Sequence, residues 1–337
     1  MVSQTDVATL AKVSFMTVSR VVNGDPRVKA STRERVQQAI EELHYYPNAA
    51  ARALNSKRTM TVGLILPKID YVLSEPYFSQ LIYQIEQAIS PYNYDILVVS
   101  GLHQNGKDLT RLYKQKKVDG LIIVGSEIND QRLIAISDNR IPAVLIHGRS
   151  ELPGLSFVDV DNYKIIEFFV NHLSSLGHRR LGFITGDLTV VNAYHRLQAY
   201  KKALKDRSLP LDKTLICTGN WSAGSGYDAF LHFYGLSELP TAVISSNDHM
   251  AIGFLKAANE HQIAIPQDIS LVGIDDIEMA QFTVPTLTTM RQPMEALASQ
   301  AVDFLMESIK SEASERFSSI LEAELVLRNS CAPARSS

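Results

Sequence analysis

Several short apolar runs in this sequence are each followed at once by polar side chains that could bind a ligand. These side chains are His147, Asp187, Asn247, Asp248, Asp275 and Asp276. Parallel sheets flanked by helices bind ligands beyond the carboxyl ends of their strands, so residues that follow strands are candidates for one common site. Carboxylate, amide and imidazole groups in fixed positions supply donors and acceptors for the hydroxyls of a small polar ligand.

Motifs for catalysis are incomplete in this sequence. Residues 101–107 have the spacing of a phosphate-binding loop, but Asp108 stands where the motif needs a hydroxyl for magnesium. Residues 220–224 resemble the nucleophile elbow of hydrolases without its first glycine. The histidines and cysteines lack the spacing of a zinc site. We therefore predict no catalytic residues, no metal and no cofactor, and we do not expect an enzyme.

The elements that must position the polar residues alternate between short apolar runs and amphipathic stretches. Strands are predicted at 62–66, 94–99, 120–124, 143–146, 181–185, 242–245 and 269–274, with helical patterns such as 78–89, 163–176 and 193–206 between them. This alternation predicts a parallel sheet with helices on both faces. A stretch of about 270 residues is too long for a single hydrophobic core, so two doubly wound lobes are expected.

Charge is distributed unevenly along the 337 residues. Residues 1–58 carry nine Lys and Arg against five Asp and Glu, a net charge of +4, and the remainder carries −7. A basic N-terminal unit suits contact with nucleic-acid phosphates, although chance could give so small an excess. Two cysteines are too few for a disulfide framework, which suits a reducing cytoplasm. No apolar run resembles a signal peptide or reaches the roughly 18 residues of a membrane span, so we expect neither export nor a membrane partner.

The N-terminal unit begins with two short helices separated by a tight break, over residues 5–23. Val7, Leu10 and Ala11 share one face of the first helix, and Ser14 is placed to cap the second. The outward side of the second helix carries Phe15, Met16, Ser19 and Arg20. These exposed side chains suit entry into a DNA groove, and the alternative is the start of any small helical bundle.

A third helix is predicted to begin at Ser31, because Ser31 and Glu34 have the spacing of a capping box, and Pro47 would stop it. With these residues in place, the chain resembles the LacI/GalR family of bacterial transcription regulators. Residues 6–24, 31–48 and 51–59 carry the resemblance, which continues to Pro333.

The resemblance implies an α/β protein with an N-terminal all-α helix-turn-helix headpiece. Its core would be periplasmic-binding-protein-like, with two doubly wound parallel-sheet lobes. We place the headpiece at 1–46, a hinge at 47–60, the effector-binding and dimerisation core at 61–330 and a tail at 331–337. Lobe 1 would comprise 61–160 and 291–318, and lobe 2 would comprise 161–290 and 319–330.

The resemblance also assigns the DNA contacts. Base-edge contacts fall to Phe15, Met16 and Arg20, and Leu54 would wedge into the minor groove when the hinge becomes helical. Phosphate contacts fall to Thr5, Ser14, Thr17, Asn23, Tyr45 and Asn48. Alternatively, Leu54 would lie in a plain connector, since isolated helices below about 12–15 residues are marginal in water.

The chain departs from the family in the turn between the first two helices. Where the family usually has glycine, this sequence has Lys12. If that residue must adopt a left-handed backbone, the side chain costs on the order of 1 kcal/mol.

For the core, the resemblance implies an effector site. The matching residues are Tyr77, Phe78, His147, Arg196, Trp221, Asn247, Asp275 and Gln292. An indole face together with fixed carboxylate, amide and guanidinium groups suits a sugar, whose apolar face stacks while its hydroxyls pair. Each residue also has a structural alternative: Trp221 could be core, Asp248 and Asp276 could cap helices, and Arg196 could pair with Asp187 on the surface.

These observations predict a cytoplasmic, sequence-specific DNA-binding repressor of carbohydrate-utilisation genes. A homodimer would bind a pseudo-palindromic operator in double-stranded DNA, and a sugar or sugar derivative that closes the lobes would release it. A co-repressor of opposite sign fits the sequence equally well. The alternative class is a stand-alone sugar-binding protein or sugar-processing enzyme on the same two-lobed fold.

Overall fold

The computed structural model describes residues 2–22, 25–45, 58–68, 72–99, 106–311 and 316–335. Asn23, Asn48, Leu54 and most of the predicted hinge lie outside these ranges. Within them, no helix combines the length and the apolar character needed to cross a bilayer.

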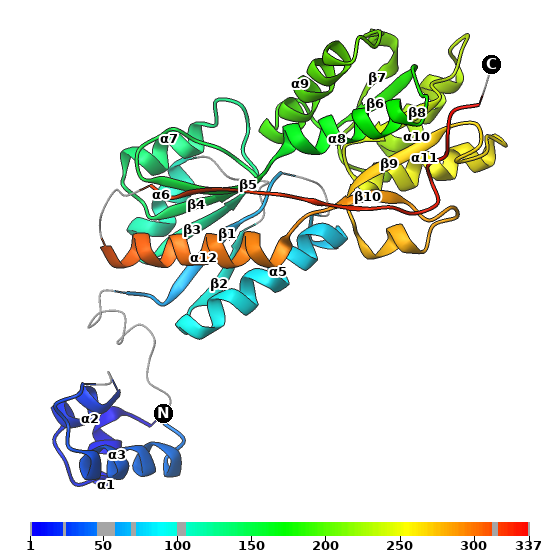
Figure 1. The fold of residues 1–337 in the computed structure, drawn as a ribbon. Helices are drawn as coiled ribbons and strands as arrows, with labels where there is room; N and C mark the ends of the chain where they lie inside the picture. The colour runs from blue at the N-terminus through cyan, green and yellow to red at the C-terminus, as the bar shows by residue number, and fades with distance from the viewer. Residues whose placement is uncertain are drawn as a thin grey trace.

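The N-terminal headpiece is built from three helices in its described part, α1 (Gln4–Leu10), α2 (Phe15–Val22) and α3 (Ala30–Glu42) (Figure 1). Val7, Val18 and Val36, one from each helix, are fully buried and form the centre of its core. Of the three residues predicted to share one face of α1, Val7 and Ala11 are buried, whereas Leu10 is 40% exposed. Ala8 is buried with them in the headpiece core.

The predicted capping box at Ser31 and Glu34 is also wrong. Helix α3 begins earlier, at Ala30, with Lys29 at the N-cap position and no side-chain cap, so Ser31 already lies inside the helix. A capping box does close α1: the backbone N–H of Asp6 donates to Ser3 Oγ at 3.4 Å, and the N–H of Ser3 donates to Asp6 Oδ2 at 2.8 Å.

Lys12, which stands where the family usually has glycine, adopts a left-handed backbone with φ of 51°. We expect Lys12→Gly to stabilise the headpiece by about 0.5–1 kcal/mol. Glycine has no Cβ and so avoids the steric strain of the left-handed backbone, and the greater backbone entropy of glycine in the unfolded chain offsets part of this gain. Thermal unfolding followed by circular dichroism would measure the gain. Lys12→Ala is the matched control, since alanine removes the ammonium but keeps the Cβ; an equal gain in both variants would contradict backbone strain as the cause.

Lobe 1 contains a six-stranded parallel sheet in the order β11-β5-β4-β3-β1-β2. The strands are β1 (Thr61–Ile65), β2 (Asp95–Val99), β3 (Gly120–Val124), β4 (Ala143–Ile146), β5 (Leu155–Val160) and β11 (Ser318–Leu321). Helices α5 (Pro76–Ile89) and α12 (Met294–Ser311) cover one face, and α6 (Gly106–Lys114) and α7 (Gln131–Asp138) cover the other. Short 3₁₀ helices, η1 (Val72–Ser74) and η2 (Ser90–Tyr92), flank α5.

Lobe 2 repeats this arrangement with the order β12-β10-β9-β8-β6-β7, in which only β12 runs antiparallel to its neighbour within the described sheet. Its strands are β6 (Leu181–Thr185), β7 (Ile216–Thr218), β8 (Ala242–Ser245), β9 (Ser270–Asp275), β10 (Thr288–Arg291) and β12 (Glu324–Val326). Helices α8 (Asn162–Ser175) and α9 (Val191–Asp206) cover one face, and α10 (Ala223–Tyr234) and α11 (Asp248–Glu260) cover the other. The 3₁₀ helices are η4 (Lys213–Leu215) and η5 (Glu278–Gln281).

The seven predicted strands are all present, with bounds that differ by at most one residue. The described chain crosses between the lobes after β5, after β10 and after β11. The last of these crossings lies beyond Leu321, because β11 pairs with β5, whereas the predicted lobe boundary was at 318 and 319.

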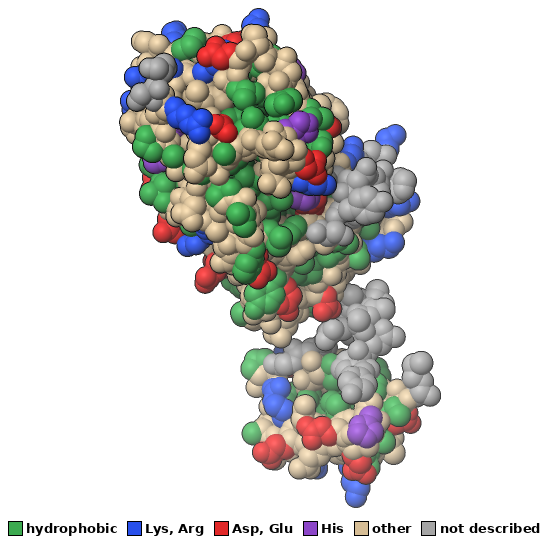
Figure 2. All heavy atoms as spheres, turned by 90° about the vertical axis from the view of Figure 1, so that its right-hand side faces the viewer, with side chains coloured by type: hydrophobic (Ala, Val, Ile, Leu, Met, Phe, Trp, Pro, Cys, Tyr) green, Lys and Arg blue, Asp and Glu red, His purple; other side chains and the backbone are tan. Residues whose placement is uncertain are grey.

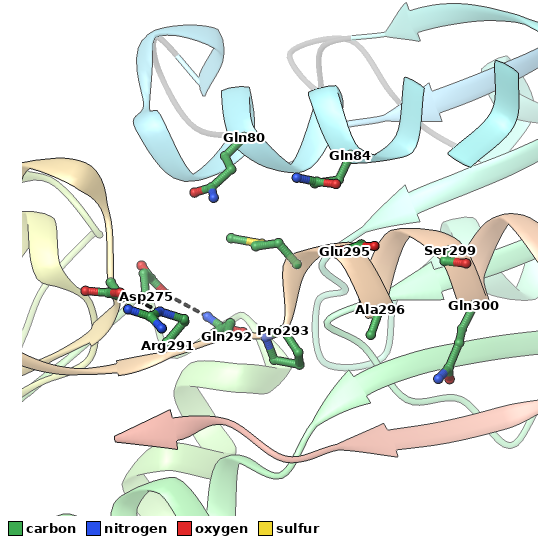
Figure 3. A pocket seen from close by; sticks show the side chains of 12 residues that line it. Gln80, Gln84, Asp275, Arg291, Gln292, Pro293, Glu295, Ala296, Ser299 and Gln300 are labelled. Atoms are coloured by element: carbon green, nitrogen blue, oxygen red, sulfur yellow. Dashed lines mark hydrogen bonds and ion pairs between the residues drawn. The ribbon is translucent and has the colours of Figure 1, made fainter. Parts of the chain in front are cut away.

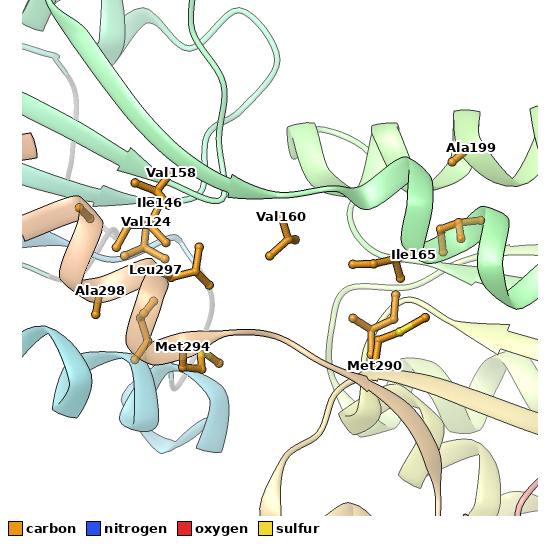
Figure 4. Packing of buried hydrophobic residues seen from close by; sticks show 14 of the residues in the cluster. Val124, Ile146, Val158, Val160, Ile165, Ala199, Met290, Met294, Leu297 and Ala298 are labelled. Atoms are coloured by element: carbon orange, nitrogen blue, oxygen red, sulfur yellow. The ribbon is translucent and has the colours of Figure 1, made fainter. Parts of the chain in front are cut away.

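One hydrophobic cluster runs through the crossings and joins the two lobes. Val160 and Ile165 on one connection face Met290 and Met294 on another (Figure 4). All four are buried, with exposed fractions of at most 6%. The connections are therefore packed segments, and they hold the carboxyl ends of both sheets toward one shared space.

Candidate effector cleft and DNA-contact face

A cleft of about 690 Å³ lies between the lobes, at the carboxyl ends of their strands. All eight residues that the sequence suggested for an effector site line it: Tyr77, Phe78, His147, Arg196, Trp221, Asn247, Asp275 and Gln292. They come from α5, α9, the ends of strands, the segments before α10 and α11, and the β10–α12 crossing, so only the tertiary fold brings them together.

Three residues that line this cleft have a strained backbone. His147, Trp221 and Asp275 adopt positive φ angles of 58°, 74° and 125°, which side chains other than glycine rarely adopt. The indole of Trp221 lies so close to Gly186 that a Cβ there would be 2.1 Å from the ring. Strained residues of this kind persist where the surrounding structure overdetermines them, which is typical of functional sites.

Arg196 is the buried cation of the cleft, with an exposed fraction of 3%. Its Nε donates to Asn162 Oδ1 at 2.7 Å, and its Nη1 donates to the carbonyl of Ser246. The guanidinium also lies 5.9 Å from the centre of the Trp221 ring. Burial lowers the pKa of Arg196. The predicted alternative, a surface pair with Asp187, is wrong, because helix α9 turns Arg196 inward.

Asp275 and Asp248 form an acidic pair below the cleft. Gln292 Nε2 donates to Asp275 Oδ1 at 2.6 Å, and burial followed by the charge of Asp248 raises the pKa of Asp275 well above its usual value. Asp248 accepts hydrogen bonds from Thr289 Oγ1 at 2.6 Å and from the N–H of Ile277 at 3.1 Å. Asp248 therefore holds β10 and the segment that follows β9 in place beneath the cleft.

Neither Asp248 nor Asp276 caps a helix, so that alternative is wrong for both. The N-cap of α11 is Asn247, whose Oδ1 accepts from the N–H of Met250 at 2.9 Å. Asp276 instead pairs with Arg291 at 2.7 Å and with Arg328 at 2.6 Å.

A chain of contacts across lobe 1 orients the aromatic side of the cleft. The hydroxyl of Tyr77 contacts Nε2 of His147, whose Nδ1 lies 3.8 Å from Asp159 Oδ1. Arg149 Nε donates to the other Asp159 oxygen at 2.7 Å. Burial alone would raise the pKa of Asp159. The contacts of this carboxyl group with His147 and Arg149 outweigh the effect of burial, so that its pKa is lowered. The two ring nitrogens of His147 thus face Tyr77 and Asp159 respectively.

The two lobes touch directly on either side of the cleft. The N–H of Ile128 donates to the carbonyl of Thr189 at 2.8 Å, and the N–H of Val191 donates to the carbonyl of Ser126 at 3.0 Å. Elsewhere, Glu75 before α5 lies 2.7 Å from His249 on α11. These contacts join lobe 1 to lobe 2 and close the cleft on both sides.

We expect Glu75→Gln to weaken effector binding about two- to fivefold, since a partly exposed contact between a carboxylate and a basic side chain contributes roughly 0.2–1 kcal/mol and this one joins the two lobes. Isothermal titration calorimetry with the effector would measure the loss. Glu86→Gln, on the exposed side of the same helix, is the matched control. Unchanged binding in Glu75→Gln would show that this pair does not hold the lobes closed.

Sequence reasoning missed several cleft residues. Ser126 and Glu127 follow β3 at its carboxyl end, so the rule that selected His147 would also have found them. Asn192 lies four residues before Arg196 and therefore on the same face of α9. Glu75 and Arg132 gave no such signal, because they reach the cleft only through lobe packing.

The predicted DNA-contact residues lie mainly on the surface of the headpiece. Phe15 and Met16 are 51% and 60% exposed, and Thr5, Ser14 and Arg20 are exposed as well. Ser14 Oγ accepts from the N–H of Thr17 at 3.2 Å, which confirms it as a capping residue. Exposed hydrophobic side chains beside an arginine form a face that can enter a groove.

Tyr45 does not share this exposure. It is only 8% exposed and packs in the headpiece core, so its position does not support the predicted phosphate contact.

A helix-turn-helix headpiece joined to a two-lobed core with a closed cleft defines a class of ligand-responsive transcription regulators. Comparison with known proteins agrees with this architecture. The profile for bacterial regulatory proteins of the lacI family matches residues 4–48, and that for the periplasmic binding protein-like domain matches residues 170–331. The HTH-type transcriptional repressor CytR of Escherichia coli (strain K12) is 32% identical over 327 residues, which cover 96% of this chain and 95% of CytR.

Solved structures show the same similarity. The lac repressor dimer bound to operator and the anti-inducer ONPF aligns with a TM-score of 0.87 and 29% identity, covering 98% of this chain and 99% of that one. The complex of the transcriptional regulator CelR with cellobiose aligns with a TM-score of 0.75 and 28% identity, covering 98% and 100%. The chain belongs to the LacI family of bacterial regulatory proteins, and it is a DNA-binding transcriptional repressor with an effector-binding core.

Proposed function

We propose that this repressor binds a pseudo-palindromic operator as a homodimer and releases it when a sugar or sugar derivative occupies the cleft. The observation that carries the proposal is the cleft itself, in which an indole face, a buried guanidinium and fixed amide and carboxyl groups converge. This set stacks on a sugar ring and pairs with its hydroxyls. The similarity to the cellobiose complex of CelR supports a saccharide.

The effector acts through the closed form of the lobes. A ligand shifts a conformational equilibrium only by its differential affinity for the two states, and the cleft residues are brought together from both lobes only on closure. Residues 47–60 connect the headpiece to lobe 1, so closure is coupled to the spacing of the two headpieces in a dimer. The same regulatory role accounts for the cleft without enzymatic chemistry, and an operator target places the protein in the cytoplasm.

Exposed hydrophobic side chains support the homodimer. Tyr83 on α5 and Leu97 on β2 are exposed in lobe 1, and Phe282 and Val284 are exposed in lobe 2, the last at 94%. A second cavity of about 670 Å³ lies between α5 and the start of α12, where Gln80, Gln84 and Glu295 line it (Figure 3). Hydrophobic side chains also gather low on the face of the core that Figure 2 shows. We assign the surface around this second cavity to the contact with a second copy of the chain.

Arg20→Ala is expected to weaken binding to the operator about 10- to 100-fold, because an arginine that reads a base edge contributes roughly 1–3 kcal/mol of discrimination. Fluorescence anisotropy with a labelled fragment from the region upstream of the gene would measure the loss. Arg35→Ala, an exposed arginine on α3, is the matched control. Equal operator affinity in wild type and Arg20→Ala would reject α2 as the recognition helix.

The effector arm of the proposal is tested by adding sugars to the preformed complex with DNA. Release of the DNA by at least one sugar supports the proposal that the effector is an inducer. Tighter DNA binding on addition of a sugar would make it a co-repressor, and indifference to all sugars would reject the saccharide site.

A further inference from the structure

The charged groups of the cleft are arranged in a way that bears on the charge of its ligand. Among the described residues that line it, the cations are Lys68, Arg132 and Arg196. The guanidinium of Arg132 forms bonds of 2.9 and 2.6 Å with the carboxylate of Asp130, and both side chains are almost fully buried. This guanidinium is already neutralised and is not available to an incoming anion.

The other two cations are also engaged. Lys68 Nζ lies 3.7 Å from Glu127 Oε1, where both groups are partly exposed. Arg196 uses two of its nitrogens on Asn162 and on the carbonyl of Ser246. Both cations therefore hold protein groups in place. The acceptors of Arg196 are neutral and leave it charged, but Lys68 and Arg132 are each paired with a carboxylate, so the described lining supplies no second unpaired cation for a phosphate.

Acidic groups line the same space. They are Glu75, Glu127 and Asp187, together with Asp275, whose raised pKa disfavours its charged form. Asp187 is exposed, and one of its oxygens, Oδ1, accepts from Thr189. A phosphate ester carries a charge of about −1.5 to −2 at neutral pH, so it would meet a repulsive field at this rim.

The helix starts around the cleft do not offer an anion site either. A helix N-terminus attracts anions through its free N–H groups, but here protein side chains occupy most of these positions. Asp130, Ser222 and Asn247 cap α7, α10 and α11 with their own oxygens, and α5 begins with Glu75 and a proline. Helix α9 has no side-chain cap, but Asp187 lies three residues before its N-cap residue, Val190.

Three uncharged side chains of the cleft have a buried polar atom without a partner in the described structure: Ser126 Oγ, Asn192 Oδ1 and Gln292 Oε1. A fourth such atom, His147 Nδ1, lies 3.8 Å from the carboxyl group of Asp159. Buried hydroxyl and amide groups without partners cost free energy, which a ligand's hydroxyls can recover by pairing with them. All three belong to residues that line the cleft.

We propose that the effector is an uncharged polyhydroxy compound and that the cleft excludes phosphorylated sugars. This inference rests on the proposed sugar site and further specifies that the ligand of that site carries no charge. Ligand hydroxyls complete the hydrogen bonds of Ser126, Asn192 and Gln292, while the acidic rim and the engaged cations disfavour a phosphate.

Matched pairs of neutral sugar and phosphate ester test this on the full-length chain. The probes are glucose and glucose 6-phosphate, ribose and ribose 5-phosphate, and cellobiose and cellobiose 6-phosphate, in thermal-shift assays followed by calorimetry. We expect a neutral member to bind and its ester to bind at least 10-fold more weakly. An ester that binds as tightly as its neutral partner would overturn the charge assignment and leave the sugar site standing. Failure of every probe would reject the sugar site and this inference together.

A charge variant separates repulsion from a simple lack of room. Asp187→Asn should narrow the affinity ratio between neutral sugar and ester about threefold, because it removes one unit of negative charge from the rim. Asp138→Asn, at the end of α7, is the matched control and should leave the ratio unchanged. An identical ratio in wild type and Asp187→Asn would show that size and not charge excludes the ester, which would overturn the proposal.

Discussion

Replacing Arg196 by alanine should abolish release of the operator by the effector while leaving binding to DNA intact. The guanidinium is buried, orders the floor of the cleft through Asn162 and Ser246, and lies against Trp221. Removing it deletes a charged donor and leaves buried acceptors unpaired, each at a cost of about 1–3 kcal/mol. We therefore expect effector affinity to fall at least about 100-fold, since 1.4 kcal/mol corresponds to a factor of ten.

The measurement is operator anisotropy across an effector titration, with thermal unfolding of the same samples. Arg180→Ala is the matched control, because Arg180 pairs with Asp212 in the same lobe but outside the cleft. The control should respond to effector like wild type. Arg196→Ala should unfold several degrees earlier and show no release. Normal release by a folded Arg196→Ala protein would show that the cleft is not the effector site.

Removing the carboxyl group of Asp248 should change how stability depends on pH. Burial raises the pKa of Asp248 to about 7 from its usual 3.8, against the opposing hydrogen bonds from Thr289 and Ile277. The folded chain thus keeps this proton to higher pH than the unfolded chain does. The stabilisation from protonation is fully present below pH 3.8 and is lost as the pH rises through 7.

Relative to Asp248→Asn, the wild type should therefore lose stability between pH 5 and pH 8, by on the order of 2 kcal/mol. Comparing the two proteins cancels the titrating groups that do not interact with Asp248; Asp275, whose pKa the charge of Asp248 raises, contributes to the difference. Urea unfolding at several pH values gives the free energies, with Asp138→Asn as an exposed control. Parallel pH curves for wild type and Asp248→Asn would contradict a raised pKa at this carboxyl.

The fold was largely predictable because its core strands are short, apolar and regularly spaced. The strands that sequence reasoning missed have weaker patterns. In β5 the residues Ser156 and Asp159 interrupt the apolar run although both are fully buried, and β11 and β12 are short edge strands. The buried carboxyl group of Asp159 is compensated by its contacts with Arg149 and His147. No local sequence pattern predicts these contacts.

The candidate site divides in the same way. Residues that end strands, such as His147 and Asp275, could be found from the sequence, because chain direction alone places them at one edge of a sheet. The partners of Arg196 could not be found, since Asn162 and Ser246 lie 34 and 50 residues away from it. The inward turn of Arg196, the support from Asp248 and the contact of Glu75 with His249 all depend on how two lobes pack.

The lobes meet at 126–128 and 189–191 through peptide groups, with N–H of one lobe on C=O of the other. Peptide groups are the same whatever side chain they carry. Glu127, Thr189 and Val190 can therefore be exchanged in evolution, and the walls of the cleft reshaped with them, without loss of the docking between the two halves. New ligands can therefore be accommodated along this seam while the peptide contacts between the lobes are kept.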